Sequence, residues 1–141
     1  MPVPAQRRVY YLTPDHMVQE YAFTNNRWIA GELNNLKHMT ASYSQLAVVH
    51  FSDQFRVYTQ RSSDNKIIEL GRGGTNAWKV ERELKEASPG SRLAASYIEG
   101  VVRLVYQGAD LKTYEINSRD NWGHGACPGP PPPPPPPPPP C

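Results

Sequence analysis

Apolar and polar residues alternate along most of the chain in runs of about five to eight residues, which is typical of β-strands. Pairs of Pro, Gly, Asn, Asp and Ser residues separate these runs, as expected for turns. One segment, "VERELKEAS" (Val80–Ser88), contains residues that favour helices, but its place in the pattern predicts the end of a strand followed by a loop. We therefore predict an all-β protein with almost no helix.

The strand pattern repeats three times. Arginines at the start of equivalent strands lie 48 and 47 residues apart, at Arg8, Arg56 and Arg103. A glutamate follows each arginine by 12 or 13 residues, and a tryptophan follows each glutamate by seven to nine. The glutamates are Glu20, Glu69 and Glu115, and the tryptophans are Trp28, Trp78 and Trp122. The regular spacing indicates three copies of one structural unit.

A further strand precedes the second and third arginines, in Ser44–Phe51 and Ser91–Ile98, which gives four strands per unit. Four strands in a repeat of about 47 residues predict the blade of a β-propeller. The first unit lacks its preceding strand, because only "MPVPAQ" comes before it. The stretch Gly31–Ser44 is predicted to be a loop that connects two blades.

Three blades cannot close a ring, because propellers have about four to eight blades. A half-ring would also leave sheet faces and edges exposed. We therefore predict that the chain associates, most simply as a homodimer whose two copies make a six-bladed ring. A fragment of a longer parent protein would show the same pattern.

The 141 residues provide for one domain, and the last fourteen are Pro-Gly, eleven prolines and a cysteine. We therefore predict a propeller domain over residues 1–126 and a polyproline tail over residues 127–141. Cys127 and Cys141 flank the prolines, which would hold them about 30 Å apart in an extended helix. A disulfide needs Cα atoms within about 7 Å, so an intrachain bridge is not expected, and an exposed thiol could link two chains.

Composition excludes several functions. The net charge of +2 is small and the basic residues are scattered, which argues against nucleic acid. The four histidines are widely spaced, so we predict no metal site and no cofactor. No apolar run approaches the ~20 residues of a membrane span, and the N-terminus has no apolar core of a secretory signal. We expect synthesis in the cytoplasm and leave open a later release by another route.

The arginine and glutamate of each unit are expected to face each other across a hairpin. Loops of three residues, Thr13–Asp15 and Gly108–Asp110, would place them opposite in the first and third units, and one more residue in the second loop would preserve the pairing. A single pair of this kind is a surface ion pair worth up to ~1 kcal/mol. Its threefold repetition beside a tryptophan favours a binding site. Guanidinium and carboxylate groups hydrogen-bond sugar hydroxyls, and an indole covers an apolar sugar face.

These motifs resemble those of the fungal fucose-binding lectins of the Aleuria aurantia type and their shorter bacterial relatives. The matching stretches are "RVYY", "VQE" and "WIAG"; "RVYTQ", "IIE" and "WKVE"; and "RLVYQ", "TYE" and "WGHG". The resemblance covers roughly residues 7–125. It implies a six-bladed propeller, a non-enzymatic role and L-fucose sites between adjacent blades. In that family, the arginine and glutamate come from one blade and the tryptophan from the next.

Carried over by position, the resemblance implies three sugar sites. The first contains Arg8, Glu20 and Trp78; the second contains Arg56, Glu69 and Trp122; the third contains Arg103 and Glu115 with Trp28 of a second copy. The sequence departs from the family pattern in both later units. Thr59 and Glu81 replace a tyrosine and a glycine in the second unit, and Leu104-Val105 replaces Val-Tyr in the third.

Two other functions were weighed. A glycoside hydrolase needs two carboxylates that flank the scissile bond, whereas each unit has one glutamate, and that glutamate faces an arginine, so we predict no enzymatic activity. The second alternative is a propeller that serves as a scaffold for protein–protein interaction, with the proline tail recruiting partners.

Overall fold

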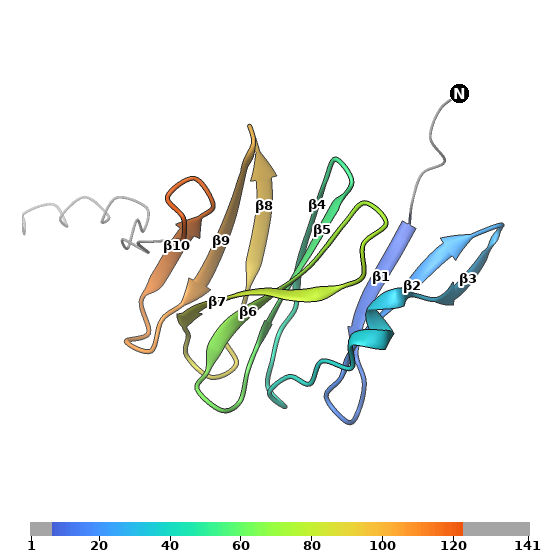
Figure 1. Ribbon diagram of the computed structural model, residues 1–141. Coiled ribbons are helices and arrows are strands. Elements are labelled where there is room, and N and C mark those ends of the chain that lie inside the picture. The colour runs from blue at the N-terminus through green and yellow to red at the C-terminus, as the bar shows by residue number, and fades with distance from the viewer. Residues whose placement is uncertain (1–6, 123–141) are drawn as a thin grey trace, which may run out of the picture.

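The computed structural model describes residues 7–122, which form three antiparallel sheets arranged side by side (Figure 1). The first sheet contains β1 (Arg7–Leu12), β2 (Val18–Thr24) and β3 (Arg27–Ala30). The second contains β4 (Ala47–Phe51), β5 (Gln54–Gln60), β6 (Lys66–Gly73) and β7 (Lys79–Glu86). The third contains β8 (Ala94–Ile98), β9 (Val101–Gln107) and β10 (Thr113–Asn117), with β9 in the centre.

This order confirms the all-β prediction and the division into units. The second unit has its four strands, and within residues 7–122 the first has three, β1 to β3. In the third unit, three strands lie within the described residues, and the predicted fourth strand would follow Trp122, outside them. The predicted tail, with Cys127 and Cys141, also lies outside the described residues. The segment "VERELKE" belongs to β7, as predicted from its place in the repeat.

The link between the first two sheets differs from the predicted loop, because it contains a short 3-10 helix, η1 (Glu32–Leu36). The helix buries Leu33 completely in the core. It is also joined to β2, since the Glu20 backbone N–H donates to Asn34 Oδ1 at 2.8 Å and the Gly31 N–H donates to the Glu20 carbonyl at 2.7 Å. These contacts order a segment that sequence propensity alone leaves irregular. No helix among residues 7–122 is long and apolar enough to cross a membrane.

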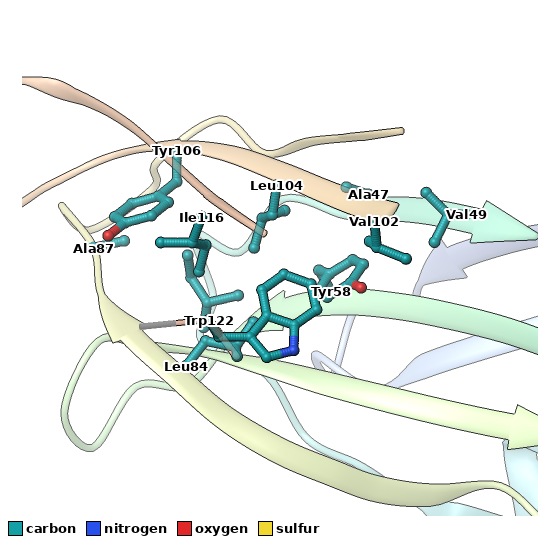
Figure 2. Packing of buried hydrophobic residues seen from close by; sticks show 11 residues of the cluster. Ala47, Val49, Tyr58, Leu84, Ala87, Val102, Leu104, Tyr106, Ile116 and Trp122 are labelled. Carbon is teal, nitrogen blue, oxygen red and sulfur yellow. The ribbon is translucent and has the colours of Figure 1, made fainter. Parts of the chain in front are cut away.

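The sheets pack face to face through two apolar clusters. The face of the second sheet that carries Phe55 and Val57 packs against the first sheet, with Val18 and Leu33. The opposite face carries Tyr58 and packs against β9 and β10. Figure 2 shows this second cluster, with the indole of Trp122 beside the ring of Tyr58. Within residues 7–122, the middle sheet is thus covered on both faces, while each outer sheet is covered on one.

The hairpins that carry the arginines are closed by longer loops than predicted. Leu12 pairs with Val18 and Gln107 pairs with Thr113, so five residues separate the paired strand ends instead of three. The five-residue loops turn through a residue with positive φ, His16 at 67° or Leu111 at 68°. The second loop is one residue longer, as predicted, since Gln60 pairs with Ile67.

The longer loops shift the register, so the predicted pairing of arginine with glutamate is wrong. Glu20 lies opposite Tyr10, and Glu69 lies opposite Tyr58. Glu115 lies opposite Val105. In each hairpin the arginine stands two residues before the partner of the glutamate. Because side chains alternate between faces with a period of two, arginine and glutamate still share one face and meet diagonally.

Candidate functional site

The first arginine–glutamate pair lies at the junction of the first and second sheets. Arg8 Nη1 lies 3.2 Å from Glu20 Oε2, and the Leu33 backbone N–H donates to Glu20 Oε1 at 3.4 Å. The Glu20 side chain is completely buried, whereas 17% of the Arg8 side chain remains exposed. Its guanidinium lies over the ring of Phe55, 4.7 Å from the centroid. Arginine is therefore the member of this pair that faces solvent.

A glycine covers the carboxylate of Glu20. A Cβ atom at Gly31 would overlap Glu20 Oε1 and the end of the Glu20 side chain. The "WIAG" motif therefore has a steric reason for its glycine, because any larger residue would displace the carboxylate.

Trp78 reaches this pair from the second sheet, through two intermediate rings. Its indole meets Tyr10 edge-on at 6.0 Å and lies 6.4 Å from Phe55. Only 5% of Trp78 is exposed, and its Nε1 is buried without an acceptor within residues 7–122. Burial, and then the charge of Glu20, raise the pKa of Tyr10 well above its ordinary value. The structure thus assembles Arg8, Glu20 and Trp78 around Tyr10.

The second pair has the same plan at the next junction. The Tyr58 hydroxyl donates to Glu69 Oε2 at 2.7 Å, and Arg56 Nε lies 4.0 Å from Glu69 Oε1. Trp122, which follows the third sheet, lies 6.1 Å from Tyr58 between ring centroids. Its Nε1 is also buried with no acceptor in the described part of the chain. Burial and the charge of Glu69 raise the pKa of Tyr58.

The second pair differs from the first in a further cation. Arg82, on β7, places its Nε 2.8 Å from Glu69 Oε1 and its guanidinium 5.7 Å from the centroid of Trp122. A cleft of about 310 Å³ opens beside Arg82 and Trp122 and is lined by the charged side chains of Glu81, Glu83 and Lys85.

The third pair is exposed on the outer face of the third sheet. Arg103 Nη1 lies 2.8 Å from Glu115 Oε1, and 42% and 29% of these side chains are accessible. Val105 stands opposite Glu115, where the other two units have tyrosine. Trp28 lies on the first sheet at the other end of the described chain, 47% exposed and packed on Phe23. One chain therefore does not bring Trp28 to the third pair.

Sequence reasoning missed the residues that join each pair to its tryptophan. Tyr10 and Tyr58 each follow an arginine by two residues, and this Arg-x-Tyr spacing was a readable signal. Phe55 gave no such signal. It lies on β5 next to Arg56 of the second site, but its ring contacts Arg8 and Trp78 of the first site. The contact of Arg82 with Glu69 could not be predicted from spacing, because it depends on a bulge in β7. Among residues 7–122, no cluster of three or more His, Cys, Asp or Glu side chains could hold a metal ion.

Comparison with known proteins places this geometry in a family. The model of the fungal fucose-specific lectin family matches residues 5–130. The fucose-specific lectin of Aleuria aurantia is 29% identical over 119 residues, covering 78% of this chain and 37% of that protein. The fucose-specific lectin of Arthroderma benhamiae is 28% identical over 145 aligned residues, covering 84% of this chain and 40% of that protein.

A solved structure shows the same fold. The crystal structure of the Aleuria aurantia lectin, a six-bladed β-propeller, superimposes with a TM-score of 0.69 at 28% identity, covering 79% of this chain and 38% of that one. The three sheets therefore have the arrangement of consecutive propeller blades. The chain spans well under half the length of the relatives that it matches.

Proposed function

Because the chain belongs to the fungal fucose-specific lectin family, we propose that it binds L-fucose and fucosylated glycans without altering them chemically. Each arginine–glutamate site contains one repeated glutamate, whereas glycoside hydrolysis typically uses two carboxylates at the scissile bond. The activity that this arrangement supports is therefore recognition.

One observation carries the proposal. At both junctions between sheets, an arginine–glutamate pair meets a tryptophan whose buried indole N–H has no acceptor within residues 7–122. Buried donors are nearly always satisfied, so each of these N–H groups calls for a partner. A sugar hydroxyl can accept from the indole while another accepts from the guanidinium, and the aromatic rings cover the apolar C–H face of the sugar.

In the first site, Arg8 donates to the sugar and Trp78 supplies the indole N–H. Glu20 is fully buried, so its first role is to hold the guanidinium of Arg8 in place. A direct bond from a sugar hydroxyl to Glu20 requires the buried carboxylate to become accessible. The second site has Arg56, Glu69 and Trp122 in the equivalent positions.

The third site is completed by a second copy of the chain. At both internal junctions, the face that carries arginine and glutamate packs against the tryptophan-bearing face of the next unit. The open face of the third sheet carries Arg103 and Glu115, and the open face of the first sheet carries Trp28. Two copies joined in the same way at both ends would make a closed ring of six blades. Trp28 of each copy would then reach the arginine–glutamate pair of the other.

The open face of the first sheet supports this assembly. It exposes Val9 and Tyr21 along with Trp28, and Tyr21 stacks on Tyr11. A contiguous aromatic surface of this kind marks an interface more often than a free surface. Several sites on one ring would raise the avidity for multivalent glycans 10²–10⁴-fold above that of a single site.

Retention on fucose-agarose with elution by free L-fucose tests the proposal, and isothermal titration with L-fucose gives the affinity, with D-glucose as the control sugar. Trp78→Phe keeps an aromatic ring but removes the N–H, and it should weaken binding by the ~0.5–1.5 kcal/mol of one hydrogen bond. Tyr97→Phe, an exposed aromatic residue on β8, is the matched control. If the folded wild-type chain does not bind L-fucose, the lectin proposal is wrong, and the protein-interaction scaffold takes its place.

A further inference from the structure

The two sites formed within one chain are not equivalent, and we propose that Arg82 fills the second site from within and thereby excludes fucose, while the first site remains available. This inference rests on the proposed function and deepens it, because it identifies the residue that decides which intrachain site takes the sugar. The two sites differ in the residue that lies opposite the glutamate on the following segment, which is Gly31 in the first site and Arg82 in the second.

In the first site, that residue has no side chain. β3 ends at Ala30, which pairs with Tyr21, and the next residue, Gly31, donates its N–H to the Glu20 carbonyl at 2.7 Å. Within residues 7–122, the cation at ion-pair distance from Glu20 is Arg8, on the same sheet. The space on the strand side of the carboxylate is thus bounded by backbone.

In the second site, an irregularity in β7 inserts a side chain at the equivalent position. Leu70 pairs with Val80, but Glu69 pairs with Arg82, so Glu81 is bulged out between them. The side chain of Glu81 folds over Gly71, close to the guanidinium of Arg56. The bulge therefore brings Arg82, and not a glycine, opposite the buried carboxylate.

Arg82 lies against the same groups that a sugar would use, although Glu69 Oε1 and Trp122 Nε1 have no hydrogen-bond partner within residues 7–122. It makes a 2.8 Å ion pair with Glu69 Oε1, while the other oxygen accepts from Tyr58. It also lies over the ring of Trp122 at cation–π distance. Both the carboxylate and the indole face are consequently occupied by a group of this chain.

Arg56 is engaged as well. Its Nη1 donates to the Phe55 carbonyl at 2.9 Å, and its Nη2 donates to Gln54 Oε1 at 2.9 Å. Fucose is neutral, so one of its hydroxyls would have to replace the ion pair between Arg82 and Glu69 with a hydrogen bond from an uncharged donor. The adjacent cleft of about 310 Å³ provides an entry once the guanidinium is removed.

The test is isothermal titration of L-fucose into the wild-type protein, Arg82→Ala and Lys85→Ala. Lys85 lines the same cleft on the same strand, so its substitution removes an equal charge without changing the ion pair to Glu69. The wild type should bind at the first site, with Trp78→Phe weakening binding and Trp122→Phe leaving it unchanged. Arg82→Ala should add one fucose site per chain or strengthen second-site binding at least about tenfold, and Lys85→Ala should do neither.

Removing Arg82 also leaves Glu69 with a weaker cation partner, so the melting temperature of each variant is measured without sugar. If Arg82→Ala does not fold, Arg82→Gln retains a donor at the same place and should show the same gain with less destabilisation. The gain must disappear when Trp122→Phe is combined with the Arg82 substitution.

The outcomes distinguish a failure of the inference about Arg82 from a failure of the proposed fucose binding. If wild-type binding falls on Arg56→Ala or Arg82→Ala, the second site already binds the sugar in the wild-type protein, and the inference is overturned. If folded Arg82 variants gain no site, the inference is likewise overturned, while wild-type binding through Trp78 leaves the proposed function in place. If neither the wild type nor any folded variant binds L-fucose, the proposed function itself fails, and the inference with it.

Discussion

Arg8 reaches Glu20 diagonally across the β1–β2 hairpin, with 3.2 Å between Nη1 and Oε2, while Tyr10 stands directly opposite the glutamate. The diagonal places the guanidinium at the edge of the junction and the tyrosine inside it. The same offset recurs in the other two hairpins, with Tyr58 opposite Glu69 and Val105 opposite Glu115. The repeated unit is therefore an arginine at the rim, a glutamate beneath it and a variable third residue.

Arg8→Gln should weaken L-fucose binding about tenfold or more, because a charge-assisted hydrogen bond contributes ~1.5–3 kcal/mol. It should also lower the free energy of unfolding, since Glu20 would be buried without its cation. Isothermal titration and urea denaturation measure the two effects. The control is Arg7→Gln, whose side chain lies on the opposite face over Phe23. Equal losses of affinity in the two variants would contradict the assignment.

Gly31→Ala should destabilise the protein by about 1–3 kcal/mol, the usual range for overpacking a filled site. The new Cβ would overlap Glu20 Oε1, so the carboxylate must move and its contact with Arg8 must lengthen. Urea denaturation measures the stability. Ala30→Ser is the matched control, because it adds one atom at the preceding, exposed position. A Gly31→Ala protein as stable as the wild type would show that the carboxylate can shift freely.

Trp28→Lys should prevent ring closure and leave a monomer, because it places a charge in the exposed aromatic face of the first sheet. Sedimentation equilibrium in the presence of a reductant measures the mass without any contribution from disulfides. Agglutination of fucosylated cells should fall far more than affinity for the monosaccharide at the first site. Leu111→Lys, an exposed apolar residue in the β9–β10 loop, is the control and should remain assembled. A monomeric variant that agglutinates fully would refute the multivalent ring.

The stability of the protein should decrease as the pH falls below about 6.5, the ordinary pKa of histidine, because of His38. Burial, and then the charge of Arg61, lower the pKa of this histidine in the folded protein. The unfolded chain therefore binds the proton more readily, so the stabilisation present above the unfolded pKa is lost as the pH falls toward the folded one.

Melting temperatures from pH 7.5 to 5 test this prediction. His38→Gln should flatten the profile, and His16→Asn, an exposed turn residue, should not. A wild-type profile that matches that of His38→Gln would exclude His38 as the cause.

Much of this organisation was readable because it is periodic. Alternating polarity predicted the strands, and the spacing of arginine, glutamate and tryptophan predicted the three units. The pairing of each arginine and glutamate with the tryptophan of the next unit was implied by the resemblance to the lectin family. The one extra residue in the second hairpin loop was also correctly placed. The length of each loop was misjudged, because the positive φ at His16 and Leu111 is a backbone choice that neither side chain signals.

The all-β class, the repeat and the positions of the repeated arginines, glutamates and tryptophans could be read from the sequence, since each of these follows from local alternation and spacing. Which of these residues meet, and which residue lies opposite each glutamate, follows only from the tertiary structure. Tyr10, Phe55 and Trp78 come together because two sheets pack face to face, and a bulge in β7 puts Arg82 where the first unit has Gly31. Packing and register depend on contacts between distant segments, so they are not encoded in any one repeat.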